Sequence, residues 1–318
     1  MQHPRPVVVL SRCLEVEACR YNGLIVRAPF VLQLMPFVDP IPVCPEVEIG
    51  LGIPRDPIRL VALEGAQHLV QPSTDHDLTD AMGSFTDEYL GALGDVDGFI
   101  LKRRSPSCGI KDTKIYSSDG ETQPSERGPG MFGGAVLERF PQAAVEDEGR
   151  LTNFRIRHHF LTKLFGLASF RVVRDSGSMA LLVQFHAEHK LLLMAYHQTE
   201  LRALGRIVAN PNKRAFAEVI ADYEVHFAHA LVRPARSKSN INVLMHALGY
   251  ISDGLGAKEK QHFLSLLDEY RAGRSTIATP LAILQSWIAR FDESYLAQQR
   301  YLEPYPRELM DLRDSGRS

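Results

Sequence analysis

The chain has 318 residues, of which 45% are hydrophobic and 23% are charged, and its formal net charge is -2 at pH 7. This composition is typical of an ordinary globular protein of about two domains, and it excludes a chain-wide basic surface for nucleic acid. The longest early apolar run, Val7 to Leu10, is too short for a membrane span or a signal-peptide core. We therefore expect a cytoplasmic protein with no membrane partner, whose four cysteines are thiols, metal ligands or catalysts rather than disulfides.

The first half of the chain alternates strand-like and helix-like stretches. Apolar runs and helical periodicity predict strands over Val7–Leu10, Val38–Val43 and Asp95–Leu101, and helices over Ala28–Met35 and Thr79–Leu93. Strands separated by helices are typical of a mostly parallel sheet. The sequence therefore predicts an α/β N-terminal domain of the doubly wound type.

From about Met179 onward the strand pattern disappears and helical patterns follow one another. They cover Met179–Tyr196, Thr199–Val208, Lys213–Leu231, Lys258–Arg271 and Pro280–Arg290. An all-α second domain is therefore expected. Polar and turn residues interrupt the pattern between Gly149 and Ser178, and we place the two domains at residues 1–165 and 166–318.

A cysteine follows each of the three predicted strands: Cys13, Cys44 and Cys108. The carboxyl ends of parallel strands face one crevice, so these thiols are expected to converge there. No paired C-x-x-C element is present, which argues against a zinc ribbon. Three dispersed thiols suit an iron-sulfur cluster with one iron free of protein ligands, and unrelated buried cysteines are the alternative.

Three motifs around these cysteines resemble the thiouracil desulfidase family. They are "SRCLEVEACRYNG" (11–23), "PVCPEVEIGLGIPR" (42–55) and "LKRRSPSCG" (101–109). The second half is similar to the YbgA-type helical domain that is often fused to that family. Its motifs are "FHAEHKLLLMAYH" (185–197), "NINVLMHALGY" (240–250) and "QQRYLEPYPREL" (298–309).

This resemblance implies a 4Fe-4S cluster with three cysteine ligands and one open iron, which takes the sulfur of a thiolated pyrimidine. The reaction then replaces C=S by C=O and releases hydrosulfide. Matched motif by motif, Glu46 corresponds to the active-site acid/base and Ser105 to the serine beside the cluster, while the ligands correspond to Cys13, Cys44 and Cys108. The implied substrates are thiouracil, a 4-thiouridine nucleotide or a thiolated RNA base, with tRNA as an expected partner.

The residues themselves leave several alternatives open. Glu48 competes with Glu46 as the acid/base. Extended pleating would put both on one face, but the turn at Pro45 makes that arrangement unreliable. Cys19 is either a spare ligand or a packed thiol, and we expect packing. A nucleic-acid-associated protein with a structural or redox-sensing cluster is the alternative function. The small basic patch of Arg233, Arg236 and Lys238, beside Asn240, would suit it.

Two further patterns are weaker. Gly128–Gly133 fits G-x-G-x-x-G but follows a polar stretch, so we expect a flexible loop that enters a helix at Ala135 rather than a dinucleotide site. His186, His189 and His197 lie at helical spacings, and no metal is assigned to them because such histidines are usually satisfied on a helix surface.

Overall fold

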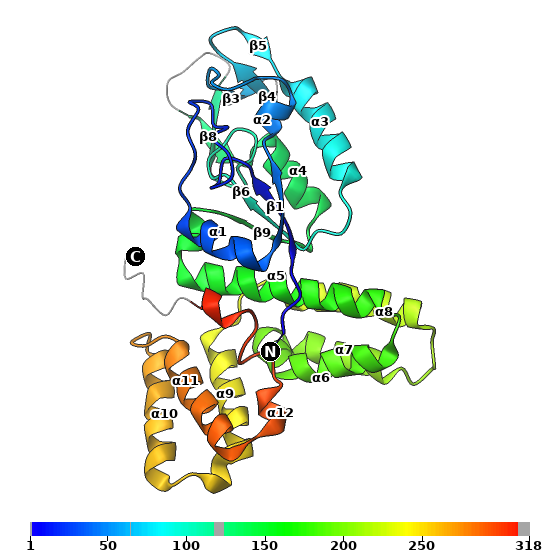
Figure 1. Cartoon of the computed structure of the whole chain (residues 1–318), viewed down its shortest axis with the longest axis vertical. Coiled ribbons are helices and arrows are strands. Elements are labelled where there is room, and N and C mark those ends of the chain that lie inside the picture. Colours follow the sequence, from blue (N-terminus) through cyan, green and yellow to red (C-terminus); the bar gives the residue numbers. More distant parts are fainter. Residues whose placement is uncertain (1, 64, 118–123, 311–318) are drawn as a thin grey trace. The chain divides into compact units, whose positions relative to one another are not determined.

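The computed structural model describes residues 2–63, 65–117 and 124–310, which form two compact units (Figure 1). One unit comprises residues 5–160, and the other comprises residues 161–310 together with 2–4. The units meet within helix α5 (Phe154–Asp175), the same helix that holds the sequence-based boundary after residue 165.

The first unit contains a four-stranded sheet in which every strand pair is parallel. Its strand order is β2-β1-β6-β9, with bounds β1 (Val7–Ser11), β2 (Asp39–Val43), β6 (Gly98–Leu101) and β9 (Ala144–Asp147). The register pairs Leu10 with both Pro42 and Ile100, so the carboxyl ends of β1, β2 and β6 lie together. After β1 the chain adds β2 on one side of it and later adds β6 on the other side, so this edge is a topological switch point.

Helices α3 and α4 lie side by side on one face of this sheet (Figure 1). Met82 of α3 and Phe132 of α4 are fully buried against Phe99 of β6 in the main apolar core of the unit. The helical segments of this unit are α1 (Pro29–Leu34), a 3-10 turn (Met35–Phe37), α2 (Pro45–Glu48), α3 (Thr79–Ala92), α4 (Met131–Arg139) and a 3-10 turn (Arg150–Thr152). The predicted α/β architecture with a parallel sheet is confirmed.

A second, mixed sheet of five strands was not predicted. Its order is β5-β4-β3-β7-β8, with bounds β3 (Arg59–Leu63), β4 (Ala66–Gln71), β5 (His76–Asp77), β7 (Thr113–Ser117) and β8 (Glu126–Gly128). Leu60, Leu69 and Ile115 on these strands are buried in the same core as α3 and α4. The strands are short and carry charges, which hides their alternation in the sequence.

The second unit is all-α, as predicted. Its helices are α5, α6 (Met179–Tyr196), α7 (Gln198–Ala209), α8 (Phe216–Ala230), α9 (Ser237–Ile251), α10 (Ala257–Arg271), α11 (Ala278–Phe291) and α12 (Ser294–Ala297), with 3-10 turns at Ser252–Gly254 and Arg307–Leu309. One apolar cluster contains Trp287, and a second stacks Phe170, Tyr223 and Phe227. None of the described helices combines the length and apolar character needed to cross a membrane.

Candidate functional site

The three cysteines that follow the strands line one cavity of about 360 Å³ at the carboxyl edge of the four-stranded sheet. Cys13 and Cys44 are each 8% exposed and Cys108 is 5% exposed. Cys13 and Cys44 lie just beyond β1 and β2, and Cys108 lies on the turn after β6. The topology thus brings together three thiols that are far apart in the sequence.

The turn that carries Cys108 is fixed by its own serine. The Ser105 hydroxyl accepts a hydrogen bond from the Cys108 amide (3.1 Å), and the Gly109 amide donates to the Ser105 carbonyl (2.9 Å). The N-terminus of α4 then donates to the same turn, through the Gly130 amide to the Gly109 carbonyl (2.7 Å) and the Gly133 amide to the Ser107 carbonyl (2.9 Å). Helix α4 therefore clamps the Cys108 turn.

The glycines of the G-x-G-x-x-G pattern allow this close approach. A Cβ on Gly133 would lie 2.2 Å from the Gly109 carbonyl oxygen, and one on Gly130 would lie 2.5 Å from the Ser107 carbonyl oxygen. The helix begins at Met131 and is preceded by the antiparallel strand β8, so the expectation of a flexible loop reaching Ala135 was wrong. The motif serves backbone packing against the turn that carries a thiol.

Glu46 and Glu48 lie on a helical turn rather than on an extended segment. Cys44 is the residue before α2, and Pro45 occupies the first helical position, where its missing N–H costs nothing. Helical geometry separates the two carboxylates, so the reservation about the Pro45 turn was justified and the extended arrangement does not occur. Glu48 lies outward in an ion pair with Arg12, whereas Glu46 lines the cavity.

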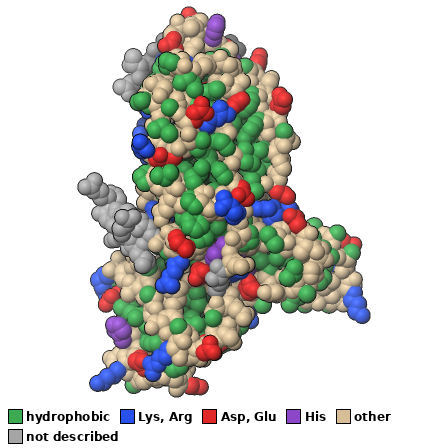
Figure 2. Space-filling view, viewed as in Figure 1, with side chains coloured by type: hydrophobic (Ala, Val, Ile, Leu, Met, Phe, Trp, Pro, Cys, Tyr) green, Lys and Arg blue, Asp and Glu red, His purple; other side chains and the backbone are tan. Residues whose placement is uncertain are grey.

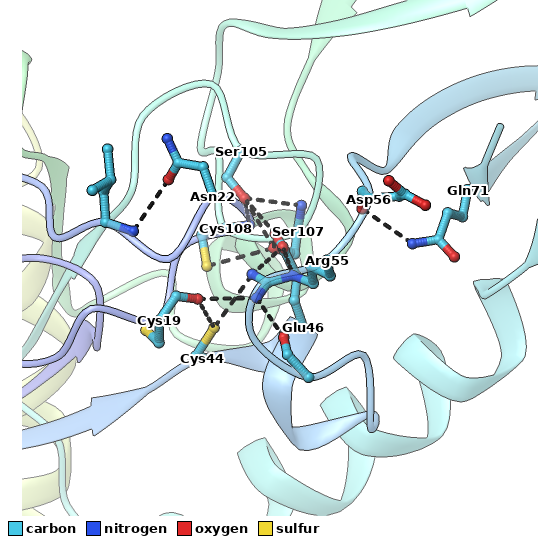
Figure 3. Close-up of polar contacts among 12 residues, drawn as sticks. Cys19, Asn22, Cys44, Glu46, Arg55, Asp56, Gln71, Ser105, Ser107 and Cys108 are labelled. Carbon is cyan, nitrogen blue, oxygen red and sulfur yellow. Dashed lines mark hydrogen bonds and ion pairs between the residues drawn. The ribbon is translucent and has the colours of Figure 1, made fainter. Parts of the chain in front are cut away.

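Each oxygen of the Glu46 carboxylate has defined partners (Figure 3). Oε2 accepts from the Arg55 guanidinium through Nη2 (2.5 Å) and Nε (2.9 Å). Oε1 accepts from the hydroxyl of Ser107 (2.7 Å) and more distantly from that of Ser105 (3.3 Å). Ser107 also lies 3.7 Å from the Cys108 sulfur, so one hydroxyl links the carboxylate to a candidate ligand.

A fourth thiol, Cys19, shares the cavity and packs with Cys13 and Cys44. Its carbonyl accepts from Arg55 Nη1 (3.0 Å). The hydrogen bond between the Cys13 and Cys19 thiols raises the pKa of Cys13 above its ordinary value and lowers the pKa of Cys19 to about 7. Burial raises the pKa of Cys44 to about 12 and that of Cys108 to about 11. Three of the four thiols thus keep their protons unless a cation displaces them.

The spacing and chemistry of these donors fit a cluster better than a single ion. Tetrahedral zinc, with Zn–S bonds near 2.3 Å, requires sulfurs about 3.8 Å apart. Within the described part of the chain, no three cysteine sulfurs all lie within 4.8 Å of one another. Soft thiols spread around a cavity suit a polynuclear iron-sulfur cluster, which spans a wider set of ligands. The residues present therefore fit such a cluster.

Several cations line the cavity, and some of them are neutralised. Lys102 pairs with Glu148 (2.5 Å) and Arg103 with Asp112 (3.3 Å). Arg20 and Arg104 also line the cavity, and neither forms an ion pair with a residue in the described ranges. The mouth of the cavity therefore retains positive charge that an anionic group can use.

Two family models divide the chain between them. The model described as 2-thiouracil desulfurase matches residues 8–148, and the model described as a protein of unknown function (DUF1722) matches residues 190–306. The protein YbgA of Escherichia coli K12 is 30% identical over 158 residues, which cover 49% of this chain and 93% of YbgA. The chain belongs to the YbgA family and carries a fused 2-thiouracil desulfurase domain.

Two further relatives match the desulfurase domain. YbbK of Bacillus subtilis is 28% identical over 111 residues, which cover 32% of this chain and 73% of YbbK. Among solved structures, the 4Fe-4S-dependent thiouracil desulfidase TudS is 29% identical, and the match covers 46% of this chain and 93% of that chain with a TM-score of 0.38. The predicted resemblance to this family, fused to a YbgA-type domain, is confirmed by the family models and by YbgA.

In the YbgA-type domain, two of the three noted histidines have ordinary structural partners. The buried His189 donates from Nδ1 to the Phe185 carbonyl (2.8 Å), and His186 lies 3.2 Å from the Tyr223 hydroxyl. His197 is the residue before α7, and its Nδ1 accepts from the Glu200 amide (3.3 Å).

The basic patch expected near the start of α9 keeps its three cations on the surface, but Asn240 does not belong to it. Arg233, Arg236 and Lys238 are exposed, but Asn240 is buried and holds two tyrosines, donating to the Tyr270 hydroxyl (3.0 Å) and accepting from that of Tyr301 (3.2 Å). On the face drawn in Figure 2, basic and acidic side chains are interspersed. Arg233 and Arg236 lie in the α8–α9 connection, and Lys238 lies in the first turn of α9.

Sequence reasoning missed two polar residues of the desulfurase domain site, Arg55 and Ser107, and left open whether Cys19 is a spare ligand or a packed thiol. Arg55 closes the second motif and its side chain is only 4% exposed, so the position of the motif was an available signal. Ser107 directly precedes Cys108, but nothing in the sequence distinguished it from Ser105. Cys19 reaches the cavity because the loop after β1 folds back, with a bridge between Leu14 and Val26.

Proposed function

We propose that the chain is an iron-sulfur-dependent desulfidase that replaces C=S by C=O in a thiolated pyrimidine. Water supplies the oxygen, and the sulfur leaves as hydrosulfide, so no oxidant or reductant is consumed. The observation that supports this most strongly is the convergence of three thiols and an anchored carboxylate on one cavity. The match of residues 8–148 to the 2-thiouracil desulfurase model agrees with it.

Cys13, Cys44 and Cys108 would hold the cluster, because each follows a strand whose end faces the cavity. When bound, a 4Fe-4S cluster with three protein ligands supplies a Lewis-acidic iron that can take the departing sulfur. Cys19 would remain a packed thiol in the wall beside Cys13. Because Cys19 lies at the same cavity as the three proposed ligands, the choice of ligands among the four cysteines must be tested directly.

Glu46 would act as the general acid/base that activates water and handles the proton of the ring. Its carboxylate lies at the cavity wall with a 13% exposed side chain, held on one oxygen by Arg55 and on the other by Ser107. These contacts fix the direction of the carboxylate before substrate enters. Ser105 would orient the Cys108 turn and donate a second, longer hydrogen bond to Oε1 of Glu46.

The unpaired cations at the cavity would bind the phosphate of a nucleotide or of a thiolated base in tRNA. Arg20 and Arg104 line the cavity and would contact this phosphate. Free thiouracil has no phosphate and would not make this contact. With four free cysteines, the chain suits a reducing compartment, and we propose the cytoplasm.

The test is sulfide release by the anaerobically reconstituted full-length chain from free thiouracil, a 4-thiouridine nucleotide and thiolated tRNA. We expect sulfide and the carbonyl product in equal amounts from at least one of them. Glu46→Gln should retain iron but lower turnover about a hundredfold to ten-thousandfold, whereas the matched variant Glu48→Gln should turn over normally. A cluster-loaded chain that releases no sulfide from any of the three would contradict the proposal and favour the nucleic-acid-associated alternative.

A further inference from the structure

A second group of metal-binding side chains lies between α7 and α8, in the domain that holds none of the cysteines. Ligand atoms of His197, Glu200 and His229 all lie within 4.8 Å of one another, and within the described ranges no other such group of three occurs. His197 and Glu200 are spaced i, i+3 at the start of α7, and His226 and His229 are spaced i, i+3 at the end of α8. His226 and His229 project from one face of α8 toward Glu200, which both contact, and His197 lies just before the first turn of α7.

The carboxylate at the centre of this group contacts neither a lysine nor an arginine side chain within the described ranges. Glu200 is 8% exposed, and its side-chain partners within the described residues are two imidazoles: His226 Nδ1 on Oε2 (2.6 Å) and His229 Nδ1 on Oε1 (2.9 Å). A buried carboxylate ordinarily requires a lysine, an arginine or a metal ion.

We propose that His197, Glu200 and His229 bind a divalent transition-metal ion of the zinc class. Two imidazoles and one carboxylate are nitrogen and oxygen donors of the kind that Zn²⁺ accepts, in a set of three that leaves one position open. His226 is a positioning residue, because it holds the second oxygen of Glu200 and does not belong to the group of three.

The geometry needs only small side-chain movements to close around an ion. Zinc with bonds of about 2.0–2.2 Å places its ligand atoms roughly 3.3 Å apart, and the three atoms already lie within 4.8 Å. His229 is on the surface, with a side chain that is 63% exposed, so an ion and a further ligand can enter from solvent. Glu200 Oε1 and His229 Nδ1 already lie 2.9 Å apart, so an ion that binds both atoms replaces the hydrogen bond between them.

The test compares His229→Ala with the matched variant His246→Ala in the full-length, cluster-loaded chain. Both histidines are exposed on helices of the same domain, so neither change removes core packing. Isothermal titration with Zn²⁺ should show one site in the parent chain and in His246→Ala, and its loss in His229→Ala. His226→Ala should retain the site with an affinity about 10- to 100-fold lower.

Zinc K-edge absorption identifies the ligands independently of the cysteines. We expect nitrogen and oxygen neighbours without sulfur in the parent chain at one equivalent of Zn²⁺. Equal zinc stoichiometry and affinity in His229→Ala and His246→Ala, or a sulfur shell that persists in both, would overturn the proposal. This outcome does not depend on desulfidase activity, because it is measured without substrate on the cluster-loaded chain, and the difference between His229→Ala and His246→Ala reports the histidine site alone.

Discussion

Helix α4 packs so closely on the Cys108 turn that adding one methyl group at Gly133 should disturb the site. In Gly133→Ala, the new Cβ would lie 2.2 Å from the Gly109 carbonyl oxygen and 2.6 Å from that of Cys108, where ordinary contact begins at 3.4 Å. The turn or the helix must therefore move by roughly 1 Å, and overpacking of this kind costs about 1–3 kcal/mol. Because the turn carries a proposed ligand, iron content should fall as well.

The adjacent glycine provides the control. In Gly134→Ala the new Cβ would meet only the Pro129 ring at 3.4 Å, and replacing a helical glycine by alanine stabilises by up to about 1 kcal/mol. The assay is urea unfolding followed by far-ultraviolet circular dichroism, with iron measured per chain. Trp287, the single tryptophan, reports the YbgA-type domain separately by fluorescence. Equal stability and equal iron content in the two variants would refute this reasoning.

Three other changes probe the remaining interactions. Arg55→Met should destabilise the desulfurase domain by about 3–5 kcal/mol, because the Glu46 carboxylate then lacks its partner. The double variant Arg55→Met with Glu46→Gln should recover part of this loss in the same urea assay. Strictly additive losses of the two single variants would contradict this prediction. Ser107→Ala should keep its iron but lower sulfide release roughly ten- to hundredfold, since the hydrogen bond from its hydroxyl to the Glu46 carboxylate is lost. Unchanged turnover at equal iron content would contradict this prediction. Burial lowers the pKa of His189 to about 3. Below pH 6.5 the unfolded chain therefore binds a proton at His189 that the folded chain does not bind. The free energy of unfolding, monitored by Trp287 fluorescence, should fall by about 2 kcal/mol on going from pH 7.5 to pH 5. His189→Gln should remove most of that slope, and an unaltered slope would contradict it.

The sequence alone predicted those features that depend on long apolar runs and strand ends. The three parallel strands, the helical second domain and the convergence of Cys13, Cys44 and Cys108 follow from that pattern. Helix α6 has the predicted bounds, Met179–Tyr196, because its apolar periodicity is sustained. The segment of helix α5 was interpreted as a domain junction, since polar and turn residues such as Arg174–Gly177 interrupt the periodic pattern there.

What the sequence could not supply was contact between segments that lack a local pattern. The five-stranded sheet depends on pairing between β3 and β7, which lie far apart in the chain. Arg55 binds Glu46 only because the loop between α2 and β3 returns to the cavity, and the loop after β1 does the same for Cys19. The glycine pattern at the start of α4 was ambiguous because close approach to a phosphate and close approach to a neighbouring backbone require the same residue type.

The most direct test of the account is the iron content and sulfide release of the four single Cys→Ser variants, reconstituted anaerobically in parallel. All four cysteines are buried at one cavity, so the comparison between Cys13 and Cys19 is matched in size, burial and surroundings. The account predicts that Cys13→Ser, Cys44→Ser and Cys108→Ser lose both iron and sulfide release, and that Cys19→Ser retains both. Loss of iron in Cys19→Ser together with retention in Cys13→Ser would contradict it.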